Sequence, residues 1–369
     1  MKSILFASHS ASRTGAPILL LDIAALLAAR GHKCSFVVGE DGPLIPEFEK
    51  IGPTFIEPLY PDELKYWREL KRASRRIAFL KETNPDLFYC NTIHPVKWLV
   101  YACFLGIPTL THVHELSMGF ATLSGLEHAM LRNFSQRYIA VSGAVKEYLV
   151  SVQHISHDKI DVVRAGIKLD RFDVEGRDNA IRRELGFESA VVVGTVGRIT
   201  PMKGSDFFLE VAATIKRRIG VGVKLKFLVV ATTDDKEFYL RFRKHLDASE
   251  LRNDFIILEN VDNVAAYYSA MDIYVSTARE DPFPLVILEA MAAKKLVVAF
   301  ATGGIPEMVT PETGVLIKGL DVTAMASALL DLIAKPEMRT AMGEAARKRV
   351  VQQFDLQQNI SQIERIIDA

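Results

Sequence analysis

Residues 191–217 read VVVGTVGRITPMKGSDFFLEVAATIKR, and this stretch decides the fold class. Its first six residues form a mostly β-branched apolar run, which is typical of a buried strand. A polar turn follows, and from Asp206 to Arg217 the apolar residues recur at helical spacing. A buried strand that turns directly into an amphipathic helix predicts one β–α unit of a parallel sheet.

The same alternation of strands and helices continues along the whole chain. In the first half, the predicted strands are Ser3–Ala7, Lys33–Val38, Leu87–Cys90, Thr109–Val113, Tyr138–Val141 and Ile160–Val163. In the second half, they are Val191–Val196, Leu225–Val230, Phe255–Leu258, Ile273–Ser276, Val297–Ala299 and Val315–Ile317. We therefore predict an α/β protein with two doubly wound, Rossmann-like sheets.

Two such sheets imply two domains. We expect an N-terminal domain over 1–168, a C-terminal domain over 169–354, and a helix over 355–369 that packs back on the first domain. Doubly wound sheets bind ligands beyond the carboxyl ends of their strands. The sequence therefore predicts that the two domains face each other across a ligand-binding cleft.

Charge and composition exclude several classes of protein. Among the 369 residues, 45 Lys and Arg balance 45 Asp and Glu, so no basic field favours nucleic acid as a partner. The three cysteines (Cys34, Cys90 and Cys103) form no C-x-x-C pair, which fits a reducing cytoplasm better than secretion. The apolar stretch over 16–29 is interrupted by Asp22 and is too short to cross a membrane.

The turn after the strand at 191–196 carries two cations, Arg198 and Lys203, before Gly204 and the next helix. Neither the G-x-G-x-x-G nor the G-x-x-x-x-G-K-[ST] spacing occurs in the chain, which disfavours a dehydrogenase or a P-loop NTPase. A guanidinium, an ammonium and the N–H groups of a helix N-terminus could together bind a diphosphate. Solvated loop charges remain the alternative.

Two more segments are candidates for binding anions or sugars. The loop after the first strand carries Gly15, which permits close backbone approach, although it could be a plain connection. In REDPFPLVILEA (279–290), Glu280 and Asp281 precede a helix that begins near Pro284, and Glu289 lies inside that helix. An acid at this position can accept hydrogen bonds from ribose hydroxyls while the helix N-terminus faces phosphate.

Further motifs follow in a characteristic order. They are HE at 114–115, AVS at 140–142, VVRAGI at 162–167, GR…KG at 197–204, an acid (Asp281) eight residues before Glu289, and GGIPE at 303–307. In this order and spacing, the chain resembles the retaining glycosyltransferases of family 4 (group 1), which have the GT-B architecture. Two departures are Asp281, where relatives most often have Glu, and Pro284, where many have Gly.

The resemblance implies a role for each matching residue. Arg198 and Lys203 would hold the diphosphate, Glu289 the ribose, and His114 would lie beside the transferred sugar. The residues implied as catalytic are His114, Arg198, Lys203 and Asp281; those implied as donor-binding are Gly15, Arg198, Lys203, Glu280, Asp281, Leu285, Val286, Glu289 and Gly304.

The implied reaction moves a sugar from a UDP- or GDP-sugar to a hydroxyl of a glycan or lipid-linked acceptor, in surface polysaccharide or glycolipid synthesis. It is described in this family as front-face substitution, in which the leaving phosphate takes the acceptor's proton. We expect no cofactor and no metal, because fixed cations can meet the charge of the leaving diphosphate. His112 and His114 share a strand face but lack a third zinc ligand. The alternatives are a nucleotide-sugar epimerase of the same fold, a sugar phosphorylase, or a non-catalytic sugar-binding protein.

The acceptor side is predicted from residues near strand ends in the first domain: His9, Arg13, Asn91, His94 and His112. Each could also be an ordinary surface or capped residue.

The segment 62–81, DELKYWRELKRASRRIAFLK, carries a local charge of +4 and an apolar side. It predicts peripheral docking on an anionic membrane surface, with a core-packed helix that has a solvated basic face as the alternative.

Overall fold

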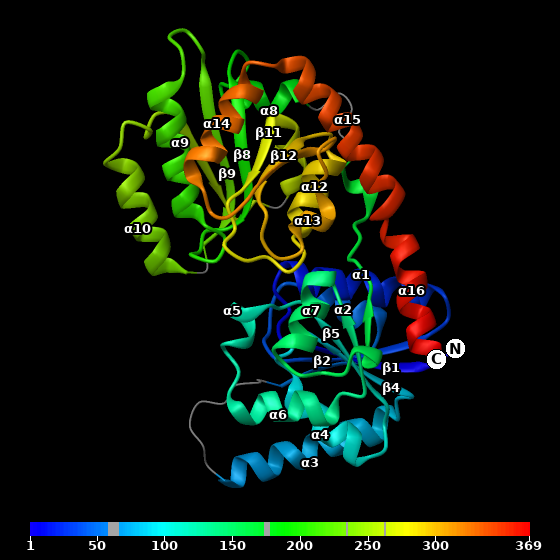
Figure 1. Ribbon diagram of the computed structural model, residues 1–369. Helices are drawn as coiled ribbons and strands as arrows, with labels where there is room; N and C mark the ends of the chain where they lie inside the picture. The colour runs from blue at the N-terminus through cyan, green and yellow to red at the C-terminus, as the bar shows by residue number, and fades with distance from the viewer. Residues whose placement is uncertain (58–65, 173–177, 234, 262) are drawn as a thin grey trace. The chain divides into compact units, whose positions relative to one another are not determined.

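The computed structural model describes residues 1–57, 66–172, 178–233, 235–261 and 263–369 (Figure 1). The chain forms two compact units. Unit 1 comprises residues 1–165 together with 357–369, and unit 2 comprises residues 166–356. The expected boundaries were 168/169 and 354/355, and those of the structure lie at 165/166 and 356/357.

Unit 1 is built on one parallel sheet, which holds seven strands within the described residues, in the order β3-β2-β1-β4-β5-β6-β7. The strands are β1 (Ser3–Ser8), β2 (Lys33–Val38), β3 (Thr54–Ile56), β4 (Leu87–Asn91), β5 (Thr109–Val113), β6 (Arg137–Ala140) and β7 (Ile160–Val162). The helices are α1 (Gly15–Ala29), α2 (Ile45–Ile51), α3 (Tyr66–Thr83), α4 (Val96–Phe104), α5 (Ser117–Phe120), α6 (Gly125–Phe134), α7 (Gly143–Ser151) and α16 (Leu356–Asp368). Helices α3, α4 and α6 cover one face of this sheet, and α1 and α2 cover the other (Figure 1).

Unit 2 has a second parallel sheet, in the order β10-β9-β8-β11-β12-β13. Its strands are β8 (Val191–Arg198), β9 (Leu225–Thr232), β10 (Phe255–Glu259), β11 (Ile273–Ser276), β12 (Leu296–Phe300) and β13 (Gly314–Ile317). Its helices are α8 (Asp178–Glu184), α9 (Ser205–Arg218), α10 (Lys236–Asp247), α11 (Val264–Ala270), α12 (Leu285–Ala292), α13 (Ile305–Met308), α14 (Val322–Ile333) and α15 (Pro336–Gln353). Short 3-10 turns span His157–Lys159 and Leu169–Phe172.

Helical periodicity positions the core of unit 2. Phe208, Val211 and Ile215 recur on one side of α9, and all three are buried in one cluster with Met325 and Leu329 of α14. This spacing places the three α9 side chains on one face, which packs on the sheet. Helices α9, α10 and α14 lie on one face of the sheet, and α11, α12 and α15 lie on the other (Figure 1).

The predicted fold class, α/β with two doubly wound sheets, is confirmed. Each predicted strand has a counterpart, and most differ by one or two residues at an end. Strand β3 was not predicted, because three residues at a sheet edge give too short an apolar pattern. The prediction that Arg198 lies in a turn is wrong, since β8 continues to Arg198, which pairs with Thr232 of β9.

The C-terminal helix α16 packs on unit 1 through one apolar side. Ile360, Ile363 and Ile367 recur at helical spacing and are all buried. On its polar side, Glu364 forms a 2.5 Å ion pair with Arg30, which directly follows α1. Helix α16 therefore belongs structurally to the unit in which the chain begins.

The structure corrects the interpretation of the basic segment 62–81. Residues 58–65, and the side chains of 66–71, lie outside the described part of the chain. Arg76 was predicted on the exposed basic face, but it is only 3% exposed. Its Nε donates to Glu57 at 2.7 Å, and its guanidinium lies 5.9 Å from the ring centre of Trp98. This helix therefore turns at least one of its cations inward.

Within the described residues, no helix combines the length and the apolar composition needed to span a bilayer.

Candidate functional site

The candidate site of unit 2 lies where the strand order of the sheet reverses. Strand β8 has β9 on one side and β11 on the other, so the two halves of the sheet separate at the carboxyl ends of β8 and β11. This is the point where doubly wound sheets bind ligands. Arg198 ends β8 and Ser276 ends β11, and both line a small cavity of about 30 Å³. The other lining residues are Thr195, Val196, Gly197, Ile199, Lys203, Ser205, Phe208, Val229, Tyr274, Thr277, Asp281 and Val286.

The loop that carries Lys203 is fixed against the end of β11. Gly204 precedes α9 in a left-handed conformation, with φ of 66°. A Cβ atom at Gly204 would lie 1.9 Å from the carbonyl oxygen of Thr277, so only glycine fits here without moving the loop. In turn, the Thr277 hydroxyl donates to the carbonyl oxygen of Gly204 at 2.7 Å. This close packing positions both Lys203 and the N-terminus of α9.

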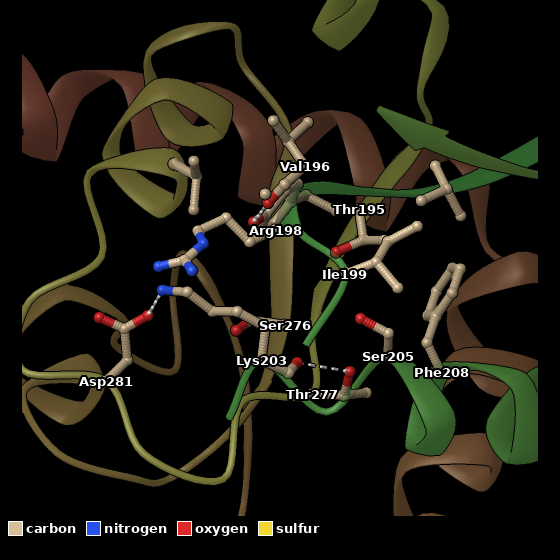
Figure 2. A pocket seen from close by; sticks show the side chains of 14 residues that line it. Thr195, Val196, Arg198, Ile199, Lys203, Ser205, Phe208, Ser276, Thr277 and Asp281 are labelled. Atoms are coloured by element: carbon tan, nitrogen blue, oxygen red, sulfur yellow. Dashed lines mark hydrogen bonds and ion pairs between the residues drawn. The ribbon is translucent and has the colours of Figure 1, made fainter. Parts of the chain in front are cut away.

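Lys203 forms an ion pair inside the cavity. Its Nζ donates to Oδ2 of Asp281 at 2.5 Å. The Asp281 side chain is 6% exposed and that of Lys203 is 27% exposed, so the pair is largely withdrawn from water. Figure 2 shows Arg198 and Lys203 extending toward the same side of the cavity as Asp281. Two cations and one carboxylate therefore meet at the switch point of this sheet.

Helix α12 begins directly after this acidic loop. Pro284 is its N-cap residue, so the missing N–H of proline removes no hydrogen bond from the helix. Leu285 and Val286 are its first two residues, whose N–H groups have no partner within a helix. The N–H of Gly304 donates to the carbonyl oxygen of Asp281 at 3.0 Å, which ties the start of α13 to the same loop.

Glu289 lies one turn into α12 and is half-buried. The hydroxyl of Tyr268, on α11, donates to Oε2 of Glu289 at 2.7 Å. Burial raises the pKa of Glu289, while the hydrogen bond from Tyr268 and the charge of Arg171 act to lower it. Sequence reasoning missed Tyr268, which belongs to none of the motifs. Glu280 is half-buried but is not among the cavity-lining residues.

In unit 1, the sheet reverses its order between β1 and β4, and His114 lies just after β5. Nε2 of His114 is 2.9 Å from Oδ1 of Asn91, the last residue of β4. The amide nitrogen of Asn91 donates to the carbonyl oxygen of Ala16, in the first turn of α1. With its amide oriented in this way, Asn91 can only accept from His114, so Nε2 of His114 carries the proton.

Burial, followed by the neighbouring imidazoles of His112 and His9, lowers the pKa of His114 well below its usual range. Burial also lowers the pKa of His112 to about 3. Both rings are therefore neutral near pH 7. Burial raises the pKa of Glu115 to about 8, although it accepts hydrogen bonds from the backbone N–H groups of His114 and Ile93.

The five predicted acceptor residues occupy different environments. Asn91 and His112 are 0% and 1% exposed in this structure, and their part in an acceptor pocket stays a prediction. The rings of His9 and His94 lie 5.6 Å apart and are half-buried. Arg13 is exposed and pairs with Glu47 at 3.0 Å. Gly15, predicted in a loop, is the exposed first residue of α1.

The rings of His112 and His114 lie beside each other at a tilt of 44°. Their ring centres are 4.2 Å apart, and Nδ1 of His112 is 2.7 Å from the Tyr89 hydroxyl. Among the described residues, no group of three His, Cys, Asp or Glu side chains is arranged to hold a metal ion.

The two doubly wound sheets define the class of the protein, a GT-B fold of two Rossmann-like units. The family model "Glycosyltransferase Family 4" matches residues 13–171, and "Glycosyl transferases group 1" matches residues 177–349. Together the two models cover most of both units. The chain belongs to the group 1 glycosyltransferases of family 4.

Individual relatives agree with this assignment. The capsular polysaccharide biosynthesis glycosyltransferase CapM of Staphylococcus aureus is 25% identical over 340 residues, covering 87% of this chain and 86% of CapM. A D-inositol 3-phosphate glycosyltransferase of Kribbella flavida is 30% identical over 220 residues, covering 58% of this chain and 51% of its own length. The crystal structure of Anabaena HepE in complex with UDP and glucose matches with a TM-score of 0.88 at 20% identity, over 100% of both chains.

Proposed function

We propose that the protein transfers a sugar from a nucleoside diphosphate sugar, UDP- or GDP-linked, to a hydroxyl of a glycan or lipid-linked acceptor. We further propose that the sugar keeps its anomeric configuration and that no metal ion takes part. The observation that carries the proposal is the convergence of Arg198 and Lys203 on one cavity at the switch point of unit 2. Surface polysaccharide or glycolipid synthesis is the proposed role.

The chemistry of glycosyl transfer explains this charge arrangement. As the glycosidic bond breaks, the sugar becomes oxocarbenium-like and the leaving diphosphate gains negative charge. Fixed cations aimed at that charge stabilise the transition state. Arg198 can offer a planar guanidinium fork and Lys203 a point charge, and the first N–H groups of α12 add to both. These groups can act without a divalent cation.

In the structure, Lys203 is already paired with Asp281 at 2.5 Å. A diphosphate that binds Lys203 must therefore compete with this carboxylate, and Lys203 can reorient because its stem has four rotatable bonds. We infer that the diphosphate takes the place of Asp281 as the partner of Lys203. Asp281 is then free to accept a hydrogen bond from the donor sugar.

The choice between uridine and guanosine is left to experiment. Anabaena HepE, a structural neighbour, holds UDP and glucose. A Corynebacterium glutamicum relative is by name a GDP-mannose-dependent mannosyltransferase. Both donors remain within the proposal.

The direct test is a panel of UDP- and GDP-sugars in the presence of a chelator. Thermal stabilisation would identify the donor, and slow release of free sugar would show bond cleavage. The configuration of the released sugar, read by NMR before mutarotation, reports retention or inversion. Conversion of the donor to its epimer would instead establish an epimerase, and stabilisation without turnover, even with acceptors, would favour a binding protein. Loss of binding in chelator would overturn metal independence.

The contribution of unit 1 has a separate test. We propose that His114 contacts the transferred sugar through Nδ1, because Nε2 is committed to Asn91. His114→Ala should then lower turnover and leave the affinity for the bare nucleotide unchanged. Equal loss of both would contradict this role.

A peripheral location on an anionic membrane is also proposed, with α3 as the docking element. Because Arg76 is buried, the other described cations of the segment are Arg72, which is half-buried, and Arg75 and Lys81, which are exposed. Each surface cation near an anionic membrane contributes about 1 kcal/mol to the free energy of binding to that membrane. Sedimentation with anionic vesicles should therefore decrease when Arg72 and Arg75 become Glu. Equal sedimentation with neutral and anionic vesicles would refute it.

A further inference from the structure

Glu289 is held from one side by a buried tyrosine. The Tyr268 hydroxyl donates to Oε2 of Glu289 at 2.7 Å and also lies 3.3 Å from the carbonyl oxygen of Val286, in the first turn of α12. Tyr268 itself is 0% exposed, and its ring contacts those of Phe172 and Tyr274. Its position is therefore set by packing on three elements: η2 (Leu169–Phe172), β11 and α12.

The hydrogen bond occupies one carboxylate oxygen of Glu289 and leaves the other, Oε1. Glu289 is half-buried whereas Tyr268 is fully buried, so of the two side chains only that of Glu289 retains surface that a ligand could contact. An unheld glutamate has several rotamers, and fixing one of them costs side-chain entropy that binding would otherwise have to overcome. Tyr268 supplies this ordering before any ligand arrives.

We propose that Tyr268 is a positioning residue for the nucleotide, whose hydroxyl orients the Glu289 carboxylate so that Oε1 accepts a hydrogen bond from the ribose. This inference rests on the proposed function, in which Glu289 binds the ribose of the donor. Tyr268 acts only through Glu289 and touches no ligand.

The pH dependence of nucleotide affinity tests this role, because it depends on the charge of Glu289 and would not change if Tyr268 only supported the fold. The groups that act on it are Tyr268 from α11, Arg171 from η2 and, by proximity, Tyr274 from β11. Burial raises the pKa of Glu289, and the Tyr268 hydrogen bond opposes this rise. Without the hydroxyl, the carboxyl group retains its proton to higher pH. The affinity lost through Tyr268→Phe should therefore grow as the pH falls.

The experiment measures the Kd of the bare nucleotide, UDP or GDP, whichever binds the wild-type protein more tightly. It compares wild type, Tyr268→Phe and Glu289→Gln at about pH 5.5 and about pH 8.5. Tyr138→Phe is the matched control. It also removes a buried tyrosine hydroxyl and its 2.7 Å hydrogen bond, here to the carbonyl oxygen of Leu131, but it does so in unit 1 and away from Glu289. The ring contacts of Tyr268 survive in phenylalanine, so the variant should fold.

We expect Tyr268→Phe to bind about tenfold more weakly than wild type at the lower pH and within about threefold at the higher pH. The Tyr138→Phe control should match wild type at both, and Tyr268→Phe should add no further loss to Glu289→Gln. An equal ratio at the two pH values, or full additivity with Glu289→Gln, would overturn the inference and leave the proposed function intact. If the wild type bound neither nucleotide, or if Glu289→Gln bound as wild type does, the ribose assignment would fail and this inference with it.

Discussion

The substitution Asp281→Asn should change nucleotide binding and turnover in opposite directions. In the structure, Oδ2 of Asp281 lies 2.5 Å from Nζ of Lys203, on the wall of the cavity proposed for the diphosphate. A bound diphosphate would have to displace this carboxylate from Lys203 and would also be repelled by it. Asparagine keeps the shape of the side chain and removes its charge.

The size of this effect follows from the burial of the pair. Two unit charges about 4 Å apart interact by about 1 kcal/mol in bulk water and by about 4 kcal/mol at an effective dielectric constant near 20. Asp281 is almost enclosed, while the side chain of Lys203 is 27% exposed, so an intermediate value applies. We expect Asp281→Asn to bind UDP or GDP more tightly by about 1–3 kcal/mol, which is about 5- to 150-fold.

Turnover of the same variant should decrease. In the proposed mechanism, the Asp281 carboxylate accepts from the donor sugar, and the loss of one such transition-state contact lowers kcat by about 10²-fold. Calorimetric titration in chelator gives the affinity, and single-turnover assays give the rate. The matched control is Asp254→Asn, which removes the same charge from an aspartate that pairs with Lys216 and Lys226 just before β10. Weaker nucleotide binding by Asp281→Asn, or equal tightening by the control, would refute the reasoning.

Three other substitutions test separate parts of the structure. Lys203→Ala should weaken nucleoside diphosphate binding by about 1.5–3 kcal/mol, measured by titration in chelator, because a charge-assisted contact is lost; unchanged affinity would contradict the assignment of the diphosphate site. Arg76→Ala should lower the free energy of unfolding by about 3–5 kcal/mol in urea titrations without altering nucleotide affinity, because it leaves Glu57 buried without its cation. Glu115→Gln should raise the melting temperature near pH 9 and change it little near pH 4.5. Folding raises the pKa of Glu115 from 4.5 to about 8, so between these two pH values the native state holds a proton that the unfolded chain has released. The stability of the fold therefore decreases as the pH rises from 4.5 to about 8, and glutamine, which carries no charge, avoids this loss.

The fold was predictable because buried parallel strands have near-continuous apolar sequences. The run Leu296–Phe300 is apolar at every position and is buried throughout. The edge strand Thr54–Ile56 gave no such signal, since it has only three residues and the last is exposed. Local sequence therefore identifies central strands much better than edge strands.

The candidate site was less predictable, because its decisive contacts join residues far apart in the chain. Lys203 and Asp281 are separated by 78 positions, and Tyr268 and Glu289 by 21. Lys203 and Asp281 each belong to a sequence motif, but neither motif indicates that the two residues pair with each other. Arg76 illustrates the same limit. The net charge of its segment does not indicate which of its cations is buried, because that depends on the ion pair with Glu57, which lies outside the segment.

Helix α16 has a consequence for how the protein can be made and divided. Unit 2 is one continuous stretch of chain, whereas unit 1 is completed by a helix that is synthesised after unit 2. While the ribosome is still producing unit 2, the nascent unit 1 lacks the contacts that α16 makes with Lys2, Arg30 and Arg137, and the surface that Ile360, Ile363 and Ile367 cover is exposed. Residues 166–356 are therefore the natural choice for isolated expression, and unit 1 is best produced by joining 357–369 to 1–165 through a linker.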